Sequence, residues 1–210
     1  MRDIRTKVCG ITRLDNALAL DALNIDYLGF NFHPASKRFI EPAAAAEIIS
    51  RLRYAKPVGV FVNAAADRIA DVAKQTGIRM AQLHGDEGWN VIEGISLPVI
   101  KAIRHTQLPD YGGLRAEWEK HESRPRYFLV DTQSGAQFGG SGEAFDWSLL
   151  QSQPLPQPFF LAGGLGPENL AEALRATNPF AVDLNSKVET APGIKDIERV
   201  KRCLEITAQS

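Results

Sequence analysis

The chain has 210 residues, of which 44% are hydrophobic and 23% charged, and its formal net charge is −1. These values are ordinary for a compact globular protein, so we expect one domain over residues 1–210. Balanced charge without a long block of one sign argues against a protein that binds nucleic acid or a membrane surface. With no recognisable leader and no apolar stretch long enough to cross a bilayer, we expect a soluble, unprocessed protein. Its two cysteines, far apart in the chain, fit a reducing cytoplasm.

Eight short apolar runs have the length and composition of buried strands. Most of them are apolar at nearly every position rather than at alternate positions, as strands buried on both faces are. The predicted strands cover residues 7–9, 27–32, 57–61, 80–83, 98–102, 127–131, 159–162 and 181–184.

Apolar residues recur at helical spacing between successive strands. Thr12 and Asp15 are expected to form a capping box at the start of the first helix, and Asp86 is expected to cap the fourth. Pro42 and Pro167 stand where a first-turn proline belongs. Further helices are predicted over 67–76 and 197–204, with a weak one over 114–119 and a short one over 145–150.

Eight strand-helix units at a spacing of roughly 26 residues are what a closed parallel barrel requires. The predicted fold class is therefore α/β, a (β/α)8 TIM barrel, a closed eight-stranded parallel barrel with minimal loops. The alternative is an open, doubly wound sheet. Such sheets usually have fewer strands and a dinucleotide fingerprint, and no G-x-G-x-x-G motif follows the first strand here.

Polar side chains at the carboxyl ends of the strands are the candidates for chemistry, because in a barrel these ends converge on one face. They are Cys9, Arg38, His84, Asp131 and Asp183. Each also has a structural interpretation, such as a loop cap for Asp131 or a solvated charge for Arg38. Asp131 favours a functional interpretation most, because it ends an apolar strand where a buried carboxylate is costly.

Cys9 ends the first strand, and the two-residue period of a strand places Lys7 on the same face. Taken alone, this stretch favours a packed cysteine, because free cysteine is commonly a small buried side chain. The other cysteine, Cys203, lies on the apolar face of the last helix and is expected in the core. Neither belongs to a CxxC pair or a Cys/His ligand pattern, so no disulfide and no metal site is predicted.

The loops after the seventh and eighth strands carry a signal for phosphate binding. TIM barrels bind phosphate at these two loops through bare backbone N–H groups and a short helix. Glycine allows the backbone to approach an anion closely, although many turns of this kind need glycine without any ligand. The candidate residues are Gly163, Gly164, Asn185, Ser186 and Lys187.

Motifs at consistent positions run from the first strand to the last. They are KVCGIT (7–12), SKR (36–38), QLHGD (82–86), the strand that ends at Asp131 with GGSG (139–142) and FDW (145–147), LAGGL (161–165), DLNSKVE (183–189) and PGIKD (192–196). Together they resemble the phosphoribosylanthranilate isomerase family over nearly the whole chain. One departure is Lys187, since this position is more often a small residue in the family.

The resemblance implies a cofactor-free Amadori rearrangement in tryptophan biosynthesis. Its substrate would be N-(5'-phosphoribosyl)anthranilate and its product 1-(2-carboxyphenylamino)-1-deoxyribulose 5-phosphate. By the same resemblance Asp131 is the general acid, Cys9 the general base, and Arg38 the partner of the anthranilate carboxylate. Lys7, His84 and Asp183 are expected at the substrate, with Lys7 helping to hold the Cys9 thiolate. The phosphate would lie among Gly163, Gly164, Asn185, Ser186 and Lys187.

Two other functions fit the same fold. The sugar isomerase of histidine biosynthesis resembles this chain in fold, but it uses an aspartate at the end of the first strand and needs two phosphate sites. A non-catalytic phosphosugar-binding barrel would need the phosphate loops without Cys9 or Asp131. Neither nucleic acid nor membrane is expected as a partner, and the sequence leaves monomer and homodimer both open.

Overall fold

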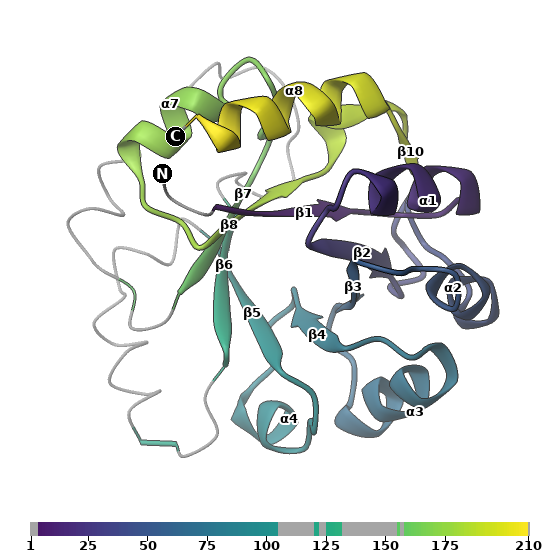
Figure 1. The fold of residues 1–210 in the computed structure, drawn as a ribbon. Coiled ribbons are helices and arrows are strands. Elements are labelled where there is room, and N and C mark those ends of the chain that lie inside the picture. Colours follow the sequence, from purple (N-terminus) through teal and green to yellow (C-terminus); the bar gives the residue numbers. More distant parts are fainter. Residues whose placement is uncertain (1–3, 105–119, 122–124, 132–154, 156–157, 210) are drawn as a thin grey trace.

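The computed structural model describes residues 4–104, 120–121, 125–131, 155 and 158–209. In this structure eight parallel strands form a closed barrel with helices outside it (Figure 1). The predicted barrel is confirmed, and the open doubly wound sheet is wrong. The strands are β1 (Arg5–Cys9), β2 (Tyr27–Asn31), β3 (Lys56–Phe61), β4 (Met80–Leu83), β5 (Val99–Arg104), β6 (Tyr127–Asp131), β7 (Phe159–Ala162) and β8 (Ala181–Leu184).

Strands pair in chain order, and β8 pairs with β1 to close the barrel. The helices outside it are α1 (Leu14–Ala22), α2 (Pro42–Ile49), α3 (Ala66–Thr76), α4 (Trp89–Glu93), α7 (Leu170–Ala176) and α8 (Ile197–Ala208). Between β8 and α8 the chain adds a 3-10 turn, η2 (Ser186–Val188), and a hairpin of β9 (Glu189–Ala191) and β10 (Ile194–Lys195). This segment was expected to be only a polar loop.

Alternate residues of each strand face opposite sides of the barrel wall. One set packs inside the barrel, where the rings of Tyr27 and Phe160 meet edge to face with centroids 5.4 Å apart. The other set packs against the helices, as Val8, Val130 and Val182 do. Burial on both faces explains why the strands are apolar at nearly every position.

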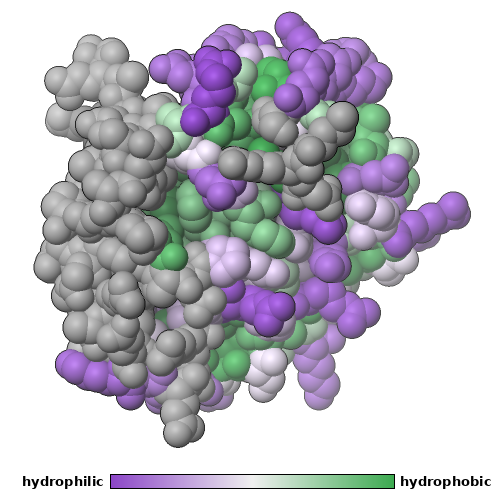
Figure 2. All heavy atoms as spheres, turned by 60° about the vertical axis from the view of Figure 1, so that its left-hand side comes forward, coloured by the Kyte–Doolittle hydropathy of each residue, from purple (hydrophilic) through white to green (hydrophobic). Residues whose placement is uncertain are grey.

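The last helix, α8, shows how the outer layer faces solvent. Val200 and Cys203 are fully buried, which confirms that Cys203 is a core residue, while Lys201 and Arg202 are exposed. Figure 2 shows hydrophilic side chains along the upper edge of the molecule, where α7 and α8 run in Figure 1. In the described part of the chain, no helix has the length and apolar character needed to span a membrane.

Three predicted helix starts are wrong. The Thr12 hydroxyl donates to the carbonyl of Gly193 at 2.8 Å, and α1 begins two residues later with Arg13 at its cap position. Asp86 lies before Gly88, the cap residue of α4. Helix α7 begins at Leu170, whereas Pro167 belongs to a turn. The predicted helices over 114–119 and 145–150, and the motifs over 139–147, lie outside the described residues.

Candidate active site

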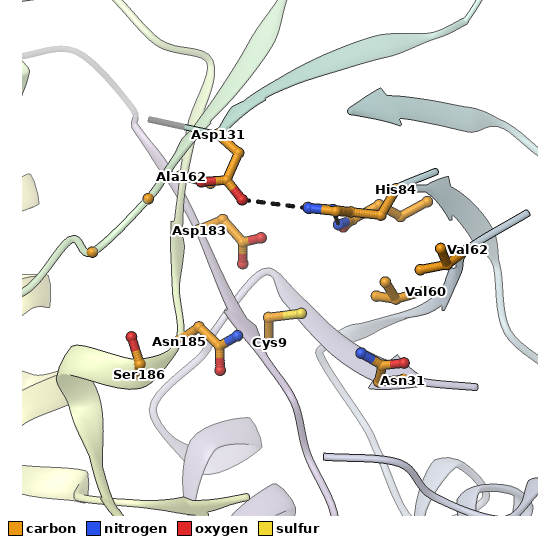
Figure 3. A pocket seen from close by; sticks show the side chains of 13 residues that line it. Cys9, Asn31, Val60, Val62, His84, Asp131, Ala162, Asp183, Asn185 and Ser186 are labelled. Carbon is orange, nitrogen blue, oxygen red and sulfur yellow. Dashed lines mark hydrogen bonds and ion pairs between the residues drawn. The ribbon is translucent and has the colours of Figure 1, made fainter. Parts of the chain in front are cut away.

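A pocket opens at the carboxyl ends of the strands, and most strands contribute a side chain to it (Figure 3). It brings together most of the residues singled out in the sequence, which lie up to 177 positions apart. The lining residues are Cys9, Asn31, Val60, Val62, Gln82, His84, Asp131, Ala162, Gly163, Gly164, Asp183, Asn185 and Ser186. Lys7, Arg38 and Lys187 stand outside this lining.

Cys9 lies at the floor of the pocket with 7% of its surface exposed. Its neighbour on β2 is Gly29, and the two residues are partners in the strand pairing. A Cβ added to Gly29 would stand 2.7 Å from the Cys9 sulfur, which is too close for any side chain. The glycine on β2 is therefore what gives the thiol its space.

Lys7 lies two residues before Cys9 on the same inner face, as the strand period predicted. Its ammonium group donates to Asp183 on β8 at 2.8 Å, and its side chain is completely buried. Burial alone would lower the pKa of Lys7, but the Asp183 carboxylate and the Cys9 sulfur outweigh it, so this pKa is raised. Lys7 therefore stays charged beneath the pocket.

Burial raises the pKa of the Cys9 thiol above its ordinary value of 9.0. Two ammonium groups, those of Lys7 and Lys195, act in the opposite direction, and the carboxylate of Asp183 adds to the increase. The resting thiol is thus protonated at neutral pH. The charges around Cys9 set the free-energy cost of forming its thiolate.

Asp131 ends β6 on the opposite side of the pocket and faces His84, the residue after β4 (Figure 3). His84 Nε2 lies 3.3 Å from the Asp131 carboxylate, and His84 Nδ1 lies 3.0 Å from the amide nitrogen of Gln82. An amide nitrogen only donates, so Nδ1 accepts and the ring proton belongs on Nε2. In this tautomer His84 donates to Asp131.

Two buried oxygen atoms in the pocket wall have no hydrogen-bond partner among the described residues. They are Oδ1 of Asp183 and Oε1 of Gln82. A buried acceptor that makes no hydrogen bond costs free energy unless something else donates to it. These atoms are therefore places where the hydroxyl groups of a bound molecule are favoured.

Four of the five predicted phosphate residues line the pocket, and Lys187 does not. Gly163 and Gly164 follow β7 with φ of 100° and 65°, a left-handed conformation that favours glycine. Asn185 and Ser186 line the same pocket after β8, with Ser186 opening the turn η2. Lys187 is exposed, and its carbonyl accepts a hydrogen bond from Arg199 at 2.6 Å.

Arg38 does not point freely into the pocket. Its guanidinium group binds the carboxylate of Glu189 on β9, with Nε 2.8 Å from Oε1. A Cβ on Gly10, the residue after Cys9, would overlap the Cδ of Arg38, so Gly10 lets this side chain pass beside the pocket. The φ of Gly10 is +79°, which also favours glycine.

Sequence reasoning missed four polar residues of this region. Gln82 and Asn31 line the pocket, and the signal for Gln82 was its place two residues before His84 on the same strand face. Glu189 and Lys195 belong to two of the motifs that carry the family resemblance, but no local sequence pattern predicts that they contact Arg38. Among the described residues, no group of three or more His, Cys, Asp and Glu side chains is placed to hold a metal ion.

Comparison with known proteins identifies the family of this chain. The family model described as N-(5'phosphoribosyl)anthranilate (PRA) isomerase matches residues 6–206. The chain belongs to the phosphoribosylanthranilate isomerase family. A relative from Myxococcus xanthus with that name is 44% identical over 200 residues, which cover 94% of this chain and 93% of the relative. This family's reaction is an isomerisation in tryptophan biosynthesis.

Solved structures of phosphoribosylanthranilate isomerases have the same fold. The isomerase from Thermotoga maritima is 36% identical, covers 99% of this chain and 100% of its own, and superimposes with a TM-score of 0.85. Another structure, of an isomerase in complex with reduced 1-(o-carboxyphenylamino)-1-deoxyribulose 5-phosphate, is 34% identical and covers 99% of this chain and all of its own, with a TM-score of 0.82. A further Thermotoga maritima structure, 34% identical over 99% of this chain and 100% of its own, shows monomers generated from a dimeric isomerase, with a TM-score of 0.83.

Proposed function

We propose that Asp131 and Cys9 carry the Amadori rearrangement of N-(5'-phosphoribosyl)anthranilate as general acid and general base. The observation that supports this division is their placement on two sides of one pocket, with Asp131 on β6 and Cys9 on β1 (Figure 3). A sugar held between them exposes its ring oxygen to one group and a carbon-bound hydrogen to the other. Both proton transfers are then within reach of one bound substrate.

Asp131 acts first, by giving its proton to the furanose ring oxygen. The bond from this oxygen to C1' breaks, and the nitrogen lone pair forms a Schiff base. The carboxylate that remains accepts the hydrogen bond from His84 Nε2, 3.3 Å away in this structure. His84 therefore stabilises the form of Asp131 that the first step produces.

Cys9 acts second, by removing the hydrogen on C2', which the Schiff base has made acidic. The electrons of the C–H bond form the enolamine, which becomes the ketone of the product when its C2' hydroxyl loses a proton and C1' gains one. The thiolate is the reactive form, and burial disfavours it. Lys7 offsets part of this cost because its ammonium group lies beside Cys9 in the barrel interior.

The rest of the substrate is held by the other residues of the pocket. Oδ1 of Asp183, which makes no hydrogen bond among the described residues, accepts from a sugar hydroxyl. The phosphate lies between Gly163–Gly164 and Asn185–Ser186, with Lys187 adding a positive charge from its exposed position. Arg38 binds the anthranilate carboxylate.

Under this proposal residues 1–210 form one domain, which works in the cytoplasm on a small phosphosugar-anthranilate molecule. It needs neither nucleic acid nor membrane. The chain functions as a monomer or a homodimer under this proposal, since every residue in it comes from one chain.

Loss of anthranilate fluorescence on fresh substrate tests the proposal. We expect Cys9→Ala and Asp131→Ala each to lower kcat by about a hundred- to ten-thousandfold. Cys203→Ala is the matched control, since it removes the other buried thiol from the outer core, and it should keep kcat near the wild-type value. A non-catalytic sugar-binding barrel would show no turnover in the wild type. Full activity in either pocket variant would refute the assigned roles.

A further inference from the structure

A buried cluster of charges lies beside the pocket, in the hairpin that follows β8. The Glu189 carboxylate receives hydrogen bonds from Arg38, from Lys195 Nζ at 2.6 Å and from the Gly193 amide at 3.0 Å. The side chains of Glu189 and Lys195 are 4% and 0% exposed. These bonds offset the burial that would raise the pKa of Glu189, and its pKa is lowered instead.

The cluster carries one positive charge more than its carboxylate can balance. It contains the cations Arg38 and Lys195 and the single anion Glu189. Glu189 and one of the two cations balance each other, so the second cation is in excess. An uncompensated buried charge is costly in free energy. A ligand that brings one negative charge to this place makes the cluster neutral.

Arg38 has a free edge on which such an anion fits. Two N–H groups of Arg38 donate to Glu189. Nε lies 2.8 Å from Oε1, and Nη2 lies 2.5 Å from Oε2. The second N–H of Nη2 and the neighbouring N–H of Nη1 point the same way and form the end-on edge of the planar guanidinium. Within the described residues, no acceptor binds Nη1. This edge matches the two oxygens of a carboxylate.

Lys195 also orients a residue of the pocket wall. Its ammonium group lies 3.0 Å from Oδ1 of Asn185. Because an ammonium group only donates, the amide of Asn185 must present its oxygen to Lys195. Its nitrogen then points toward Cys9, as Figure 3 shows. Lys195 thus orients Asn185 in the pocket wall, and its partner Glu189 binds Arg38 beside the pocket.

We propose that Glu189 is a positioning residue, held by Lys195, that fixes the Arg38 guanidinium as the receptor for the aromatic carboxylate of the substrate. This inference rests on the proposed role of Arg38 and adds the reason why this flexible side chain is specific. Fixing the guanidinium before binding reduces the side-chain entropy that a carboxylate contact would otherwise cost. The substrate carboxylate neutralises the excess charge of the cluster.

Two ligands that differ only in the carboxylate test the proposal. One is reduced 1-(o-carboxyphenylamino)-1-deoxyribulose 5-phosphate, and the other is the same molecule with an unsubstituted phenyl ring. Calorimetry gives the Kd of each, and their ratio is the carboxylate preference. We expect the wild type to prefer the carboxylated ligand by roughly ten- to a hundredfold, and Arg38→Gln to abolish the preference.

Glu189→Gln should lower the carboxylate preference by about tenfold and leave the Kd of the unsubstituted ligand nearly unchanged. The double variant Arg38→Gln/Glu189→Gln should show no lower preference than Arg38→Gln alone, because Glu189 acts through Arg38. In turnover, Glu189→Gln should raise KM with little change in kcat, since the carboxylate is bound in both ground and transition states.

Glu189→Gln leaves Lys195 buried without its carboxylate partner, which threatens folding. Glu189→Gln/Lys195→Gln removes both charges, keeps the side-chain lengths and is expected to lower the preference in the same way. The matched control is Asp26→Asn, which takes a carboxylate from Arg5 at the opposite end of the barrel, where the two groups are 2.9 Å apart. It should keep the wild-type preference.

The possible failures are distinguishable. If Arg38→Gln keeps the preference, the role of Arg38 in the proposed function is wrong and the positioning role is wrong with it. If Arg38→Gln abolishes the preference but both Glu189 variants keep it, only the positioning role is overturned. Equal weakening of both ligands by Glu189→Gln would show that Glu189 supports the fold alone, and would also overturn the proposal.

Discussion

Lys7 and Asp183 are register partners on β1 and β8, where the barrel closes, and they form an ion pair of 2.8 Å with exposed fractions of 0% and 6%. Cys9 follows Lys7 on the same face. The positive partner lowers the pKa of Cys9 and the negative partner raises it. The ion pair therefore gives two variants with opposite expected effects on one thiol.

Lys7→Met should slow alkylation of Cys9 by iodoacetamide at pH 8, and Asp183→Asn should speed it. A change of one pKa unit corresponds to about tenfold in thiolate fraction. Cys203 does not compete, because burial raises its pKa to about 12. Lys56→Met, at the exposed start of β3, is the control lysine. Equal rates in Lys7→Met and the wild type would mean that Lys7 does not influence the thiol.

The pH profile of kcat/KM follows from the same thiol. In the active form Asp131 carries a proton and Cys9 does not, so the two groups together hold one proton. Between the two macroscopic pKa values of the pair this total does not change, and kcat/KM is constant there. Because burial raises the pKa of Cys9 above 9.0, we expect a plateau that extends past pH 9.0 and then falls. Activity that declines between pH 7 and 8.5 would be inconsistent with this assignment.

Lys187 lies in the loop after β8 that is predicted to bind phosphate, and its side chain is exposed. If it adds charge to the phosphate site, Lys187→Ala should raise KM by roughly two- to fivefold and change kcat little, because an exposed charge is worth at most about 1 kcal/mol. Steady-state kinetics at low and high salt measure this. An unchanged KM at low salt would place the ammonium group in solvent.

Local sequence patterns were sufficient where one element alone decides the outcome. The bounds of β4, β6, β7 and β8 agree with those predicted, because each is a short apolar run between polar residues. The start of α1 was wrong because Thr12 bonds Gly193, which lies 181 residues further along the chain. Patterns of neighbouring residues cannot predict a hydrogen-bond partner so distant in sequence.

The site divides in the same way. The strand period and the convergence of strand ends in a barrel predicted that Cys9, His84, Asp131 and Asp183 would share one pocket. The pairing of Arg38 with Glu189 spans 151 positions and depends on a hairpin that has no strong sequence signal. The direction of a side chain such as Arg38 was therefore beyond what the sequence alone could predict.

Asp21 illustrates a carboxylate that supports the fold rather than the chemistry. It accepts hydrogen bonds from the amides of Arg53, Tyr54 and Ala55, at 2.9, 3.0 and 2.7 Å, just before β3. Although burial opposes ionisation, these bonds lower its pKa. A lowered folded-state pKa contributes stability at neutral pH that is lost as the pH falls through the acid range.

Asp21→Ala should therefore lower the free energy of unfolding by about 2 kcal/mol at pH 7, and by less at pH 3. Urea denaturation at the two pH values measures the difference. Asp71→Ala, an exposed aspartate on α3, is the control and should change stability little. A loss for Asp21→Ala that is the same at both pH values would assign the effect to packing instead.

Gly29→Ala tests whether the space beside Cys9 is needed for activity. The new Cβ would stand 2.7 Å from the Cys9 sulfur and 3.1 Å from its Cα, so β1 and the thiol must shift. Gly59→Ala is the matched control on β3, because its Cβ would instead meet Ile78 and Phe61, at 2.6 and 2.8 Å.

Both variants should lose about 1–3 kcal/mol of stability through overpacking. Only Gly29→Ala should also lower kcat, by about a hundredfold, since a shift of about 1 Å in a catalytic group is enough for that loss. Equal kcat values in the two variants, measured well below their unfolding temperatures, would mean that the position of the Cys9 sulfur does not limit the reaction.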